Sequence, residues 1–272
     1  MFLRSRRAKL RPSDLGLAEG VRSRRVPGLR REELAAAADI SVAYYIRMEQ
    51  GRAGHVSDEV IEAVARALQL NPSERGHLHN LARASHRGRP TTGSGAGSLD
   101  GRLQGIQALL SALRGAAYVV GPRGDILAWN SATTALFGPW RDLAPEERNW
   151  GRLLFDSPGY RDLFVDWRGK AFDYVGYLRG YAGRWPDDPE LGALVDRLAS
   201  VSGTFRQMWE SHDVKDLAHG VKVLRHPRAG ILRLRFENLA LPSDPELLLV
   251  SFHPEPGSDD EERFDRLLAR VR

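Results

Sequence analysis

Residues 31–52 read REELAAAADISVAYYIRMEQGR, and this stretch decides the fold of the first third of the chain. Its first part, residues 32–38, consists of strong helix formers. Leu34, Ala35 and Ala38 would lie on one apolar stripe of that helix. The pattern therefore predicts a short helix with one face turned toward a core.

A turn and a second helix follow directly. Asp39 interrupts the apolar pattern and tolerates left-handed backbone dihedrals, and Ser41 can cap the next helix. That helix should cover residues 42–50, with Gly51 as its C-terminal stop. Two helices joined by a short turn predict a helix-turn-helix unit.

Two more helices should complete this region. Residues 58–68 form an amphipathic pattern, and a further helix should begin at Pro72 and end near residue 85. Within the helix over residues 42–50, Tyr45 should pack in the core, whereas Tyr44 should be exposed.

The segment over residues 31–52 resembles the phage-repressor-like (XRE) family of helix-turn-helix regulators, which usually has glycine where this chain has Asp39. The resemblance implies that the helix over residues 42–50 enters the major groove of double-stranded DNA. It also implies a set of DNA contacts from this helix and its flanks. These are Arg30, Arg31, Ser41, Val42, Ala43, Tyr44, Arg47, Gln50 and Arg52.

Arg47 is the leading candidate for reading a base, because its guanidinium can pair with guanine in two places at once. The alternatives are a phosphate contact or a surface salt bridge. Arg30 and Arg31 should sit over the DNA backbone, unless they only form a solvated helix start.

Charge supports a nucleic-acid partner. The first 90 residues hold 17 of the 40 Lys and Arg but only 10 of the 35 Asp and Glu. A local basic excess suits contact with phosphates. A basic loop with Arg22, Arg24 and Arg25 should add phosphate or minor-groove contacts.

Length and composition indicate two domains. A chain of 272 residues is long for one domain, and residues 88–101 contain five glycines and almost nothing apolar. We expect a DNA-binding domain over residues 1–87, a flexible linker over 88–101, a second domain over 102–258, and a C-terminal helix or tail over 259–272. The absence of cysteine and of long apolar runs suits a cytoplasmic protein with no membrane insertion.

The second domain should be mixed. Residues 103–113 have helical spacing, residues 117–120 and 126–130 suggest strands, and later strands are expected at 221–225, 231–237 and 247–252. Helices should fill the middle, at residues 145–155, 159–181, 191–201 and 204–211. The fold class is thus an all-α five-helix helix-turn-helix domain plus an α+β domain with a small antiparallel sheet and covering helices.

Short motifs in this domain carry a second resemblance. They are Ala128-Trp129-Asn130, Glu146 to Asn149, Leu153 to Asp156, His212-Asp213-Val214, Arg225-His226-Pro227 with Gly230, and Glu255 to Ser258. Their order is similar to that of the MmyB-like ligand-binding domain. The resemblance implies a PAS-like fold that encloses a small apolar ligand, which is fatty-acid-like in part of the family.

An acyl ligand needs an apolar lining and a polar group for its head. Candidates for the lining are the aromatic residues Trp129, Phe137, Phe155, Phe164, Trp167, Phe205 and Trp209. Candidates for holding a carboxylate are Asn130, Arg148, Asn149 and His212. The alternatives are that these aromatics form plain core, that Asn130 only caps a helix, and that His212 only bonds a buried backbone group.

No catalytic motif accompanies these features: HExxH, GxSxG and the phosphate-binding loop are all missing from the sequence. We therefore expect a homodimeric, ligand-responsive regulator with no enzymatic activity and no cofactor besides a bound fatty acid. The alternative is a DNA-binding interaction protein whose second domain binds a protein and no small ligand.

Overall fold

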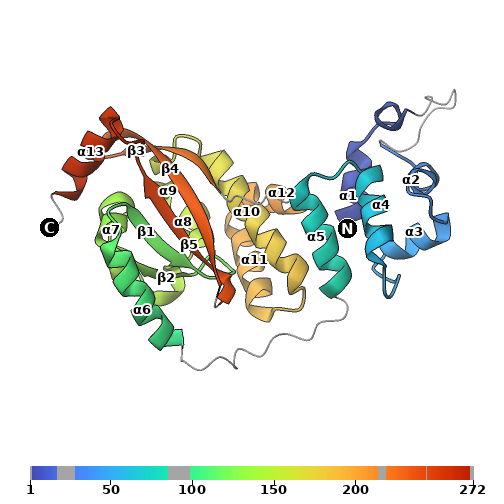
Figure 1. The fold of residues 1–272 in the computed structure, drawn as a ribbon, viewed down its shortest axis with the longest axis horizontal. Coiled ribbons are helices and arrows are strands. Elements are labelled where there is room, and N and C mark those ends of the chain that lie inside the picture. The colour runs from blue at the N-terminus through green and yellow to red at the C-terminus, as the bar shows by residue number, and fades with distance from the viewer. Residues whose placement is uncertain (1, 17–27, 85–98, 214–218, 243, 270–272) are drawn as a thin grey trace.

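The computed structural model describes residues 2–16, 28–84, 99–213, 219–242 and 244–269. Its N-terminal part is helical (Figure 1), with α1 (Phe2–Lys9), a 3₁₀ turn (Pro12–Leu15), α2 (Arg31–Ala37), α3 (Val42–Glu49), α4 (Asp58–Ala67) and α5 (Pro72–Ala84). The basic loop with Arg22, Arg24 and Arg25, and residues 88–98 of the expected linker, lie outside the described residues. Within the described part, no helix is long and apolar enough to cross a membrane.

The turn between α2 and α3 follows its expected chemistry. Asp39 takes a left-handed conformation with φ of 53°, and the Ser41 hydroxyl accepts a hydrogen bond from the Tyr44 backbone amide at 3.2 Å. The core beneath the turn includes Leu34, Tyr45 and Ile61, which are almost fully buried. The prediction of a helix-turn-helix unit with Tyr45 in its core is confirmed.

The second part combines helices with one antiparallel sheet of β1 (Ala116–Val120), β2 (Ile126–Trp129), β3 (His219–His226), β4 (Gly230–Leu241) and β5 (Asp244–His253). The strand order is β2-β1-β5-β4-β3. The first strand pairs with the last, so that Tyr118 lies opposite Val250 and Phe236 lies opposite Phe252. The expected α+β fold with a small antiparallel sheet is confirmed.

Helices cover both faces of this sheet (Figure 1). One face packs against α6 (Leu99–Ala112) through Leu110, Val119 and Leu249. The other face carries the main core, beneath the helices inserted between β2 and β3. They are α7 (Ser131–Phe137), α8 (Trp150–Asp156), α9 (Pro158–Leu163), α10 (Trp167–Arg184), α11 (Pro189–Val201) and α12 (Gly203–Glu210).

Two boundaries differ from the expected ones at the ends of this domain. The helix α6 begins at Leu99, so the end of the expected linker is helical. The last helix, α13 (Asp259–Leu268), buries Phe264 and Leu267 in the same core as the sheet. It therefore packs as part of the second domain.

Two expected helices are each broken. Residues 145–155 form a 3₁₀ turn (Pro145–Glu147) and then α8, because the Asn149 side chain accepts hydrogen bonds from the Gly151 and Arg152 amides and starts a new helix. The expected helix over residues 159–181 is likewise divided into α9 and α10. Between them, the Val165 amide bonds to the Val223 carbonyl of β3.

Candidate functional site

The exposed surface of α3 is the first candidate site. The helix lies at the end of the molecule remote from the sheet (Figure 1), and Tyr45 is its one buried residue. Arg47 is exposed, with its guanidinium carbon 5.6 Å from the centre of the Tyr44 ring. Ser41 and Ala43 are exposed beside it. Val42 is half-buried, and so is Tyr44, which the sequence predicted to be exposed, because its ring packs against the Arg47 side chain.

Arg31 is held at the end of α3 by the Glu49 carboxylate. Its Nε lies 2.6 Å from the Glu49 carboxylate, which also accepts a hydrogen bond from Arg7 at 3.0 Å. This buried carboxylate ties α1 and α2 to the end of α3. Burial, followed by the Glu49 charge, raises the pKa of Tyr45 to about 12. The sequence did not reveal this ion pair, since Arg7 and Glu49 are 42 positions apart.

The remaining predicted DNA-contact residues surround α3. Arg30 precedes α2, and Gln50 and Arg52 follow α3; all three are exposed. The structure thus brings the predicted set together at one end of the domain.

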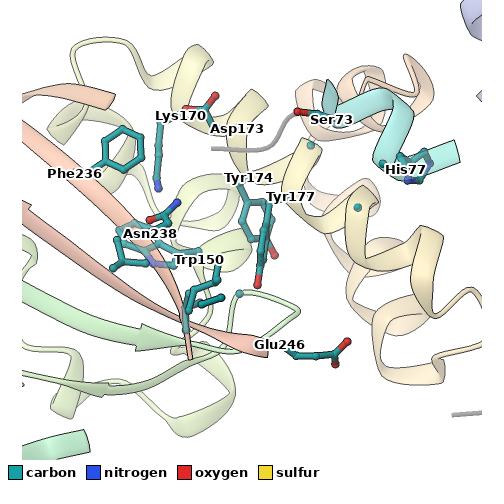
Figure 2. A pocket seen from close by; sticks show the side chains of 18 of the residues that line it. Ser73, His77, Trp150, Lys170, Asp173, Tyr174, Tyr177, Phe236, Asn238 and Glu246 are labelled. Atoms are coloured by element: carbon teal, nitrogen blue, oxygen red, sulfur yellow. The ribbon is translucent and has the colours of Figure 1, made fainter. Parts of the chain in front are cut away.

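A cavity of about 560 Å³ is the second candidate site. It lies between α10 and the sheet and extends to α5 of the N-terminal domain (Figure 2). Aromatic rings form much of its wall, from Tyr118, Trp150, Tyr174, Tyr177, Phe236 and Phe252. Its volume is in the range typical of small-molecule sites.

Lys170 places a positive charge inside this cavity. Its side chain extends from α10 toward the region of Trp150 and Asn238 (Figure 2), and its ammonium nitrogen lies 4.6 Å from the centre of the Trp150 ring. Among the described residues, no carboxylate forms a salt bridge with this ammonium. Burial, followed by the charge of Lys222, lowers the pKa of Lys170 to about 8, so the group stays mostly cationic at pH 7.

The charged and hydroxyl groups next to Lys170 already have ion-pair or hydrogen-bond partners within the protein. Asp173 pairs with Lys222. Tyr174 donates to the Arg123 carbonyl at 2.9 Å, and Tyr177 donates to the Gly121 carbonyl at 3.1 Å. Lys170 therefore differs from the cavity-lining cations Arg184 and Lys222, which form salt bridges, although the Asp173 charge acts on it and partly offsets the lowering of its pKa.

None of the ligand residues expected from the sequence, all of which the structure describes, lines this cavity. The aromatic members pack in the core of the second domain: Phe137 stacks on Trp140, while Phe155 and Trp209 flank Phe205. Trp129 lies edge-on to Trp140, and Trp167 donates to the Leu154 carbonyl at 3.0 Å. The centre of the Phe164 ring lies 5.8 Å from the Lys170 ammonium.

The polar residues that were predicted to hold a carboxylate bond to other groups of the protein. Asn130 caps α7 and Asn149 caps α8, and Arg148 donates to the carbonyls of Trp140, Arg141 and Leu143. His212 contacts Arg179 at the boundary with the N-terminal domain, 2.7 Å from nitrogen to nitrogen. Their roles as ligand contacts stay predictions.

Sequence reasoning did not select the residues that do line the cavity. In β4, Leu232, Leu234 and Phe236 are buried and alternate with exposed residues, and Phe236 lines the cavity. Lys170 lies in the expected helix over residues 159–181, but Arg168 and Asp173 are charged as well, so its charge alone gave no signal in the sequence.

Two family models match this chain. Residues 1–78 match a helix-turn-helix domain family, and residues 103–268 match the family of the MmyB-like transcription regulator ligand binding domain. A search of curated proteins found no match. The two matches define a helix-turn-helix protein with a ligand-binding domain, and neither family is enzymatic.

The second match covers more than half of the chain, which therefore belongs to the MmyB-like transcription regulator family. A DNA-binding domain joined to a ligand-binding domain makes the protein a ligand-responsive transcription regulator.

Proposed function

We propose that the protein binds specific DNA sequences through α3, and that its cavity takes an apolar ligand with an acidic head group, such as a fatty acid. The observation that carries the ligand class is the Lys170 ammonium, which lies in an aromatic cavity and forms no salt bridge among the described residues. A carboxylate at this position would gain a charge-assisted hydrogen bond, while the rings would contact its chain.

Fluorescence titration with cis-parinaric acid and its methyl ester tests this assignment. Replacing Lys170 by methionine should weaken binding of the acid by about 10- to 100-fold, the equivalent of one hydrogen bond to a charged group. Binding of the neutral ester should change little, because methionine keeps an unbranched chain against Trp150. Equal losses for both probes would contradict a head-group role for Lys170.

Analysis of the native ligand is an independent check. Denaturing the purified protein and analysing the extract by mass spectrometry should release a fatty-acid-like molecule. Repeated recovery of nothing, together with no binding of either probe, would favour a domain that binds a protein partner instead.

For DNA, we propose that the protein acts as a homodimer, with two copies of α3 about 34–36 Å apart on successive major grooves. Arg47 is exposed on α3 and next to Tyr44, which supports a base contact. Arg30, Arg31, Ser41, Val42, Ala43, Tyr44, Gln50 and Arg52 are proposed to supply the surrounding contacts.

Replacing Arg47 by alanine should cost about 1–3 kcal/mol of binding free energy on a site selected from random DNA, and it should relax sequence preference. Fluorescence anisotropy with selected and scrambled duplexes at two salt concentrations measures both effects. Arg206→Ala, at an exposed position on α12, is the matched control and should bind like the wild type. Equal weakening on both duplexes would assign Arg47 to phosphate instead of a base.

A further inference from the structure

The DNA-binding domain packs directly on the ligand-binding domain through α5 and α10. At Gly183 of α10 an added Cβ would lie only 2.4 Å from the His77 ring, so the two helices meet closely there. At Gly76 of α5 and Gly180 of α10 an added Cβ would meet nothing within 4 Å, so space remains between the helices. Part of the cavity occupies this space.

A polar clamp holds the same two domains together. Arg6 of α1, which is only 6% exposed, bonds Glu74 of its own domain at 2.7 Å and Asp213 of the other domain at 2.8 Å. Arg6 also donates to the His212 carbonyl, and Lys9 pairs with Asp213. Burial alone would raise the pKa of Asp213, but the hydrogen bonds from Lys9 and Arg6 lower it below its usual value.

One wall of the ligand cavity therefore comes from the DNA-binding domain. The α5 residues Ser73, Gly76, His77 and Asn80 line the cavity with the residues around Lys170, and Ser73 and His77 are seen on this wall in Figure 2. His77 is 5% exposed. Its Nδ1 has no hydrogen-bond partner among the described residues, which leaves a buried polar atom at this wall.

From this arrangement we infer that the ligand site is shared between the two domains, and that ligand binding and docking of the DNA-binding domain stabilise each other. The inference rests on the proposed function of the cavity as an acyl-ligand site. A ligand that touches both walls binds the docked arrangement more tightly than the open one. Reciprocity then requires that weakening the docked arrangement lowers ligand affinity, typically by 5- to 150-fold in coupled systems.

The decisive variant is Arg6→Met in the full chain, because Arg6 lines no part of the cavity but holds the two domains together. We expect it to weaken cis-parinaric acid binding at least fivefold. Arg4→Met, at an exposed position of the same helix, is the matched control and should leave the affinity unchanged. If Arg6→Met does not fold, Asp213→Ala removes the same contact from the other domain and should have the same effect.

A second variant forces the helices apart. Gly183→Leu would push against His77 and should also weaken cis-parinaric acid binding at least fivefold. Gly192→Leu on α11, where an added Cβ meets nothing within 4 Å, should leave this binding unchanged. Wild-type affinity for the probe in Arg6→Met would overturn the inference. This holds even if Gly183→Leu binds the probe more weakly, because that loss would then reflect local damage to α10.

The outcomes distinguish a failure of the shared site from a failure of the proposed ligand class. If Lys170→Met weakens binding of cis-parinaric acid while Arg6→Met keeps wild-type affinity, only the shared site is refuted. If the wild-type protein binds no probe, the proposed ligand class fails and the shared site fails with it.

Discussion

Replacing Asn130 by aspartate is expected to lower the free energy of unfolding of the ligand-binding domain by about 3–5 kcal/mol. The side chain is 5% exposed. Its amide nitrogen donates to the carbonyls of Leu110, Leu113 and Gly115 at 3.1, 3.3 and 2.8 Å. An aspartate carboxylate cannot donate, so it would leave these acceptors unpaired and set a negative charge against them.

The loss of stability should come from the NH₂ group of Asn130 alone, because aspartate keeps the side-chain oxygen. It accepts from the Ala117 and Thr133 amides, and aspartate would keep these bonds. Asn71→Asp is therefore a matched control, since Asn71 uses its side-chain oxygen to accept from the Glu74 amide at the start of α5. Urea unfolding should show a change within about 0.5 kcal/mol for this control, because aspartate caps helices as well as asparagine does. Similar losses in the two variants would contradict the role given to the Asn130 amide.

The helix-turn-helix domain was predictable because its signals are local. Asp39 and Ser41 act on the backbone within three positions of themselves. The apolar stripe of α2 is recognised from residues three or four positions apart in the sequence. Even here a long-range element was missed. Glu49 is a polar residue in the sequence pattern, but the structure buries it between Arg7 and Arg31.

The divided helices of the second domain show where local patterns fail. Helical periodicity continues through Phe164, yet the backbone there leaves the helix to pair with Leu224 of β3. That strand begins more than fifty positions later, so its influence cannot be read from nearby residues. The Asp166 side chain then caps α10 by accepting from the Gly169 amide at 2.8 Å.

The cavity could not be predicted, because it is formed by helices and strands that are far apart in the sequence. An aromatic stripe shows that a helix has an inward face, but it does not show which rings meet a neighbouring helix and which face open space. In this chain the open space lies partly against α5. The contact that fixes α5 there joins Arg6 to Asp213, which are 207 positions apart.

The same boundary between domains should make the protein sensitive to acid. Burial, followed by the charges of Arg179 and Arg6, lowers the pKa of His77 from 6.5 to about 3, and His212 and Arg184 act in the same direction. His77 is thus neutral in the docked protein, while it would take up a proton below about pH 6.5 once exposed. Stability contributed by the neutral ring is complete above pH 6.5 and is lost as the pH falls toward 3.

Between pH 6.5 and pH 4.5 the free energy of unfolding should therefore fall by about 2–3 kcal/mol because of His77, at about 1.4 kcal/mol per pH unit. Burial and Arg179 lower the pKa of His212 to about 4, which adds a smaller loss in the same window. Urea unfolding of His77→Gln at these two pH values should show a correspondingly flatter dependence. His79→Gln, on the same helix but bonded to Glu62, is the matched control; if it flattens the dependence as much as His77→Gln does, the acid sensitivity does not arise at the α5–α10 contact.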